Sequence, residues 1–135
     1  LNWAPNLVHV HGWISSLIPL YIKHYYKDDP IFSSTKTIVS VYEDRLSGKF
    51  DKNFLKKIQF DEIVDENLNL LKTPTYEELY KLSLTQADGI VFTSKTVKEE
   101  FNGLIKNDTP TLVCSSSDDD YENKYLDFYN SMLDE

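Results

Sequence analysis

The chain is best understood from the stretch Pro5-Asn6-Leu7-Val8-His9-Val10-His11-Gly12-Trp13-Ile14-Ser15-Ser16-Leu17-Ile18-Pro19-Leu20-Tyr21. Residues 6–11 are apolar at nearly every position apart from two histidines, a pattern typical of a central or near-central strand covered on both faces. A tight turn at His11-Gly12 and an amphipathic helix over residues 13–27 are predicted to follow, with Pro19 near the start of the helix. An open α/β sheet keeps its chemistry beyond the carboxyl ends of its strands, so His11 is the first candidate site residue.

The remaining residues continue this alternation of strand and helix. Further strands are predicted over residues 36–42, 89–93 and 111–114, and the last helix over 119–133. One or two short helices are expected within residues 51–72. Thr73-Pro74 is predicted to open the next helix, with Thr75 and Glu78 as an overlapping capping box and Gly89 at its end.

Strands separated by helices cannot form hairpins, so they are expected to pair in parallel through right-handed crossovers. The predicted fold class is therefore α/β, a three-layer Rossmann-like parallel sheet. Residues 1–135 show no internal repeat and no linker, which predicts a single unit. The first residue is Leu1 and the first strand follows closely, so we expect this unit to be a fragment of a longer chain.

Composition excludes several classes of function. The 135 residues carry a formal net charge of −8 and no basic cluster, which argues against a nucleic-acid partner. No apolar run is long enough to span a membrane. Cys114 is the single cysteine, so no intrachain disulfide can form, and a cytoplasmic location is expected.

Three blocks of sequence, in register with one another, are similar to conserved segments of bacterial glycogen and starch synthases. The first is the stretch quoted above. The second is Lys36-Thr37-Ile38-Val39-Ser40-Val41 with Gly48-Lys49-Phe50, and the third is Tyr80-Lys81-Leu82-Ser83-Leu84-Thr85-Gln86-Ala87-Asp88-Gly89-Ile90-Val91-Phe92-Thr93-Ser94. Together they cover roughly residues 4–101 and identify the chain as resembling this family.

The resemblance implies a retaining glucosyltransferase of the GT-B architecture, which moves glucose from ADP-glucose to an α-1,4-glucan. The three blocks belong to the later half of the family's N-terminal, acceptor-side domain. The implied partners are a nucleotide-sugar donor, a glucan acceptor, and the missing N-terminal half and nucleotide-binding domain, supplied in cis or in trans. No cofactor and no metal are implied, and these residues alone are expected to be inactive.

The chain departs from the family at four positions within these blocks. Gly12 stands where the family has Asp, Ile14 where it has a second His, and Tyr42-Glu43 where it has His-Asn. These changes motivate an alternative function, a catalytically degenerate domain that binds a glucan or a protein. A third possibility is an α/β domain that shares only the architecture.

Candidate site residues follow from strand ends and from the resemblance, and each has a structural alternative. His11 is the catalytic candidate, implied to contact the sugar, or else a half-buried histidine bonded to backbone. Gly12, Trp13, Tyr42, Glu43, Thr93 and Ser94 are the substrate-binding candidates.

The alternatives for these residues are ordinary structural roles. Trp13 can stack on glucose or belong to the core. Glu43 and Asp44 can act at the site or be solvated loop charge. Thr93 and Ser94 can meet a phosphate or cap a helix. His9, two residues deeper in the strand, is expected to be structural, and a His9/His11 metal pair lacks a third ligand.

Overall fold

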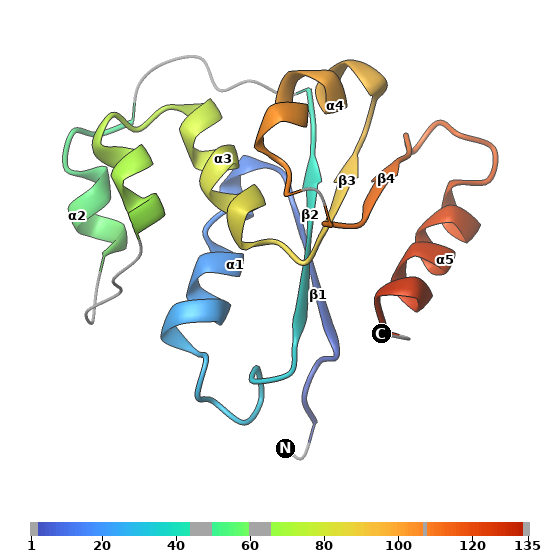
Figure 1. Cartoon of the computed structure of the whole chain (residues 1–135), viewed down its shortest axis with the longest axis horizontal. Helices are drawn as coiled ribbons and strands as arrows, with labels where there is room; N and C mark the ends of the chain where they lie inside the picture. Colours follow the sequence, from blue (N-terminus) through green and yellow to red (C-terminus); the bar gives the residue numbers. More distant parts are fainter. Residues whose placement is uncertain (1–2, 44–49, 60–65, 107, 134–135) are drawn as a thin grey trace.

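A computed structural model of the chain describes residues 3–43, 50–59, 66–106 and 108–133. Its centre is a four-stranded parallel sheet in the order β1-β2-β3-β4 (Figure 1). The strands are β1 (Leu7–His11), β2 (Lys36–Val41), β3 (Gly89–Phe92) and β4 (Thr111–Val113). The predicted α/β fold is confirmed, and each strand lies within one residue of its predicted range.

Strand β1 lies at one edge of the described sheet, so the prediction of a central or near-central strand was wrong. Val10 is the buried residue of β1, whereas β2 is buried along nearly its whole length. Apolar side chains on both faces are typical of every strand in a covered parallel sheet. The helices that cover the two faces of a sheet bury its side chains, whereas neighbouring strands bond only to its backbone. An apolar sequence pattern therefore reports the helices and cannot distinguish an edge strand from a central one.

One face of the sheet is covered by α3 (Tyr76–Gln86) and α4 (Lys95–Phe101). The side chains that pack there form a continuous buried cluster: Val10, Val39, Val41, Tyr76, Tyr80, Leu84, Ala87, Ile90, Phe92, Val97 and Phe101.

Helix α3 begins two residues later than predicted. Thr75 has an extended backbone and its hydroxyl accepts a hydrogen bond from the backbone N–H of Glu78 at 3.2 Å, so Thr75 is the cap. Thr73 and Pro74 therefore lie before the helix and do not open it. Gly89 does not end the helix either, because α3 stops at Gln86 and Gly89 is already the first residue of β3.

The helix predicted over residues 13–27 is divided into three short pieces. A 3₁₀ turn (Trp13–Ser15) is followed by α1 (Ile18–Leu20) and a π-helical turn (Tyr21–Tyr25). Pro19 lies in the first turn of α1, where its missing N–H leaves no hydrogen bond unmade. The proline can therefore start a helix here but cannot continue one from Trp13.

The predicted short helices within residues 51–72 are α2 (Phe54–Ile58) and a 3₁₀ segment (Glu66–Lys72), with residues 60–65 outside the described part. Together with α1 and α3 they enclose a second buried apolar cluster: Leu20, Ile58, Leu68, Leu71, Leu79 and Leu82. This cluster lies beyond α3 as seen from the sheet, on the left of Figure 1.

The opposite face of the sheet is covered by α5 (Tyr121–Leu133), which stands apart from the other helices in Figure 1. Phe128 and Met132 of α5 pack on the sheet. They lie so close to Gly89 that a Cβ there would be 3.0 Å from Met132 Sδ and 3.2 Å from Phe128 Cζ. A side chain at residue 89 would require these two side chains to shift by a few tenths of an ångström, so Gly89 suits the close approach of α5. With α5 in place, helices cover both faces of the sheet.

Candidate functional site

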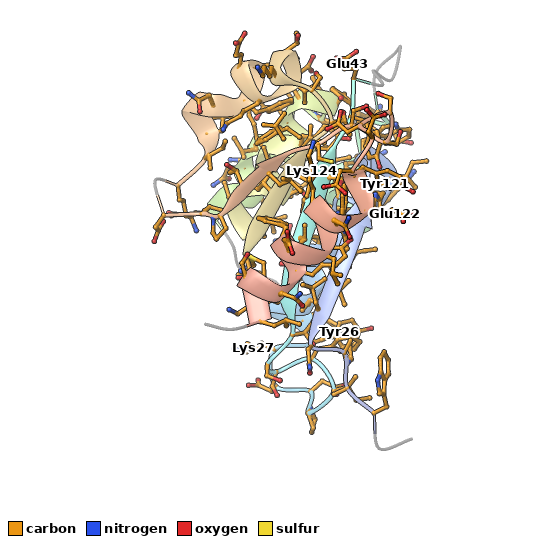
Figure 2. The ribbon with its side chains drawn as sticks, turned by 90° about the vertical axis from the view of Figure 1, so that its right-hand side faces the viewer. Tyr26, Lys27, Glu43, Tyr121, Glu122 and Lys124 are labelled. Carbon is orange, nitrogen blue, oxygen red and sulfur yellow. The ribbon has the colours of Figure 1, made fainter. Side chains whose placement is uncertain are left out.

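Several of the predicted site residues meet at the carboxyl ends of the strands. A pocket of about 480 Å³ is lined by Tyr42 and Glu43 after β2, Thr93 and Ser94 after β3, Ser115 and Ser116 after β4, and Tyr125 of α5. Parallel strands place their carboxyl ends at one edge of the sheet, which is why residues up to 83 positions apart line one cavity. Figure 2 shows Glu43 at the same end of the molecule as Tyr121, the first residue of α5.

The exposed His11 lies beside this pocket and is oriented by one of its residues. His11 Nδ1 is 2.9 Å from the hydroxyl oxygen of Tyr42. Partial burial lowers the pKa of His11, so the imidazole is neutral near pH 7. No hydrogen bond to Nε2 is present within the described residues. A neutral ring fixed at one nitrogen can offer the other to a ligand as a donor or an acceptor, according to its tautomer.

Gly12 shapes the turn that follows His11. Its φ of 70° and ψ of 178° belong to a backbone region that only glycine enters without strain. Its N–H donates to the carbonyl oxygen of Ser40 at 3.1 Å, and its carbonyl accepts from the hydroxyls of Ser15 and Ser16. Gly12 contributes this backbone geometry and does not line the pocket.

Trp13 is partly buried and packs against the interior of the protein. Its ring contacts both large apolar clusters and meets Phe50 edge to face, with ring centroids 5.9 Å apart. It does not line the pocket. Of the two alternatives for Trp13, these contacts favour packing against the core, and stacking on glucose stays an untested prediction.

Glu43, Ser94 and Thr93 are linked to the chain by hydrogen bonds at the pocket. The Ser94 hydroxyl donates to Glu43 Oε1 at 2.6 Å and accepts from the backbone N–H of Val97, so Ser94 caps α4. The Thr93 hydroxyl donates to the carbonyl oxygen of Val41 at 3.0 Å. Ser94 therefore has the capping role that was one of its two alternatives. Asp44, the neighbour of Glu43, lies outside the described residues.

A polar cluster next to the pocket was missed by the sequence reasoning. His9 Nδ1 is 2.7 Å from the Tyr129 hydroxyl, and His9 Nε2 is 2.8 Å from the hydroxyl of the fully buried Ser40. Burial, with a smaller contribution from His11, lowers the pKa of His9 to about 4. His9 is thus a neutral residue with both nitrogens bonded, in keeping with its expected structural role.

The signal that could have identified this cluster is weak. The polar side chains at His9, His11 and Ser40 share one face of β1 and β2, since they alternate with Val10 and Val39. A polar face on a covered strand needs polar partners, and Tyr129 on α5 is one of them. The identity of those partners depends on how α5 crosses the sheet, which local sequence does not encode.

Within the described residues, no three His, Cys, Asp or Glu side chains come together in a way that would hold a metal ion. In the same part of the chain, no helix combines the length and the apolar character needed to cross a bilayer.

Comparison with known proteins gives a consistent result. The sequence model of the starch synthase catalytic domain matches residues 1–104. The glycogen synthase of Chlorobium phaeovibrioides is 30% identical over 113 residues, 79% of this chain and 21% of that protein. The glycogen synthase of Thermotoga maritima is 42% identical over 55 residues, 41% of this chain and 11% of that protein.

The glycogen synthase of Vibrio parahaemolyticus is 28% identical over 103 residues, 74% of this chain and 20% of that protein. Where the similarity extends over most of this chain, the chain spans about a fifth of the relative's length. The family match itself covers β1 to α4, which carry most of the pocket, and ends before β4 and α5. With three quarters of its residues in that match, the chain belongs to the starch synthase catalytic domain family.

Proposed function

We propose that this chain forms part of a glycogen or starch synthase-like glycosyltransferase, which moves glucose from ADP-glucose to the end of an α-1,4-glucan. The observation that carries the proposal is the convergence of Tyr42, Glu43, Thr93 and Ser94 on one pocket, with His11 bonded to Tyr42 at its side. Membership of the family supports glycosyl transfer. The donor, the acceptor and the GT-B architecture rest on the resemblance described above.

His11 is the proposed catalytic residue. As a neutral imidazole bonded through Nδ1 to the Tyr42 hydroxyl, it presents Nε2 to a sugar hydroxyl or to the group that leaves the transferring sugar. The hydrogen bond restricts rotation of the ring, and a preoriented polar group stabilises charge that develops in a transition state. Gly12 sets the turn behind this residue, and Glu43, Thr93 and Ser94 provide oxygen atoms for sugar hydroxyls.

Transfer also requires parts that the relatives possess and these residues do not supply. We propose that residues 1–135 act as the later half of an acceptor-side domain, completed in cis or in trans by the first half and by a nucleotide-binding domain. The chain alone is expected to transfer no glucose, and a cytoplasmic location fits a nucleotide-sugar donor.

The test is His11→Ala in the complete native protein, assayed by ADP release with saturating ADP-glucose and glycogen. Loss of a single positioned contact is expected to lower kcat by about 30- to 1,000-fold, equivalent to roughly 2–4 kcal/mol. His24→Ala is the matched control, because His24 bonds to Gln86 on α3, away from the pocket. Unchanged kcat in a folded His11→Ala protein would overturn the catalytic role.

A second candidate, the degenerate binding module, is favoured by one feature of the site. Tyr42 and Glu43, which replace the family's His-Asn, are already hydrogen-bonded within the chain, to His11 and to Ser94. If the complete wild-type protein binds glycogen but releases no ADP, this second function is the correct one.

A further inference from the structure

Tyr125 of α5 extends the pocket beyond the residues that the family resemblance identifies. Tyr125 lines the pocket and is half-buried. Its ring stacks on His9, with centroids 5.8 Å apart and planes 28° apart. Tyr121 and Tyr129 meet it edge to face at 6.3 Å and 5.9 Å. Three aromatic rings therefore lie next to Tyr125, which lines the pocket with its own ring.

The position of α5 is fixed by contacts of residues that follow Tyr125 on the helix. Tyr129, one turn later, bonds to His9, which in turn bonds to Ser40. Phe128 and Met132 pack on the sheet above Gly89. The orientation of Tyr125 is thus set before any ligand arrives, which lowers the entropic cost of binding.

The chemistry of the pocket indicates the class of ligand. Its described lining combines two tyrosines, hydroxyls from Thr93, Ser94, Ser115 and Ser116, and one carboxylate, with no lysine or arginine. A pyrophosphate is bound by cations or by several aligned backbone amides. A neutral sugar instead offers hydroxyls to oxygen atoms and the C–H groups of its ring to the negative face of an aromatic ring.

We infer that Tyr125, together with Ser115 and Ser116 of the β4–α5 loop, forms a subsite for one glucose unit of a neutral α-glucan chain. The inference rests on the proposed function for the choice of ligand, and it assigns a role to residues that lie beyond the family match at 1–104. Tyr125 contacts the sugar ring. His9 and Tyr129 are positioning residues that act through α5.

The experiment uses the complete native protein, labelled with ¹⁵N, and titrates it with maltoheptaose while the amide shifts of residues 1–135 are followed by NMR. Wild-type protein is expected to bind, with the largest shifts at Ser115, Ser116 and Tyr125. Tyr125→Ala is expected to raise the Kd about tenfold, while Tyr125→Phe, which keeps the ring, stays within about threefold.

The matched control is Tyr26→Ala, which removes an exposed tyrosine at the opposite end of the molecule (Figure 2) and should leave the Kd unchanged.

Ser116→Phe provides an independent test if Tyr125→Ala fails to fold. Ser116 is exposed and makes no hydrogen bond within the described residues, so a bulky side chain there fills the pocket without removing an internal contact. It should abolish the shifts.

The outcomes separate the two proposals. Wild-type protein that does not bind maltoheptaose would overturn the proposed glucan function. Binding that survives in both a folded Tyr125→Ala variant and the Ser116→Phe variant would overturn the subsite alone. ADP-glucose should not shift the amides of Ser115, Ser116 or Tyr125, and if it does so as strongly as maltoheptaose, the assignment of a neutral ligand is wrong.

Discussion

The two faces of the sheet differ in what they bury. The face under α3 and α4 packs an almost entirely apolar cluster in which Ile90, Phe92 and Val39 have no exposed surface. The face under α5 buries few apolar residues and adds His9, which bonds to Ser40 and to Tyr129 of α5. The same strands contribute to both faces, since alternate residues point to opposite sides. One face therefore stabilises the fold, and the other leaves polar groups next to the pocket.

The largest expected effect is on the apolar face. Phe92→Ala removes a side chain with no exposed surface from the cluster under α3 and α4, and should lower the free energy of unfolding by about 3–5 kcal/mol. Phe128→Ala, on α5, should cost about half as much because a mostly exposed helix can settle into the space. Urea unfolding followed by circular dichroism measures both. Equal losses would show that the two faces contribute alike.

The next effect concerns the spacing between α5 and the sheet. Gly89→Ala places a Cβ at 3.0 Å from Met132 Sδ and should destabilise the protein by about 1–3 kcal/mol through overpacking. A shorter side chain at Met132 should relieve the contact, so Gly89→Ala should cost less in a Met132→Ala background. A double-mutant cycle by urea unfolding measures the difference. Identical costs in the two backgrounds would mean that the strain lies elsewhere.

The polar face should make stability depend on pH. His9 has a pKa of about 4 in the folded protein and 6.5 when unperturbed, so the unfolded state binds more protons between these values. Stability is then expected to fall as the pH is lowered from about 6.5 to 4, with His11 acting in the same direction. Melting temperatures between pH 7 and 4.5 measure this slope. The slope should flatten in His9→Gln, and an unchanged slope would exclude His9 as its source.

The smallest effect is expected at the start of α5. Lys124 Nζ is 2.9 Å from Asp118 Oδ2, and the two side chains are 43% and 34% exposed. Lys124→Ala should lower the melting temperature only slightly, and less still at high salt, since exposed ion pairs are screened by solvent and ions. Thermal melts at two salt concentrations test this. A loss comparable to that of Phe128→Ala would show that charge, and not packing, holds α5 in place.

Elements with local causes could be predicted from the sequence. Residues 36–42 and 89–93 are mostly apolar because both faces of each strand are covered by helices. The apolar runs alone therefore predict β2 and β3. Parallel pairing then brings Tyr42, Glu43, Thr93 and Ser94 to one edge, which is the core of the candidate site. These inferences need only the order of the elements.

Features that depend on distant contacts could not be predicted. Trp13 follows a strand end, and its packing against Phe50 and both apolar clusters depends on residues far along the chain. The edge position of β1 depends on which strand lies beside it, and nothing in Leu7–His11 records this. Tyr125 reaches the pocket because of the path of α5, although its spacing in the sequence indicates only an amphipathic helix.

The order of the strands has a consequence for how the protein is made. The order of the strands in the sheet is the order in which they are translated. Each strand after β1 therefore leaves the ribosome when the neighbouring strand with which it pairs has already been made. The sheet can lengthen by one strand at a time without breaking an earlier pairing. Helices α3 and α4 are translated before α5, so one face of the sheet can be covered first. Ile38 and Val91 on the other face stay uncovered until Phe128 and Met132 of α5 have been synthesised. During those seconds of synthesis the uncovered face is a surface to which chaperones can bind.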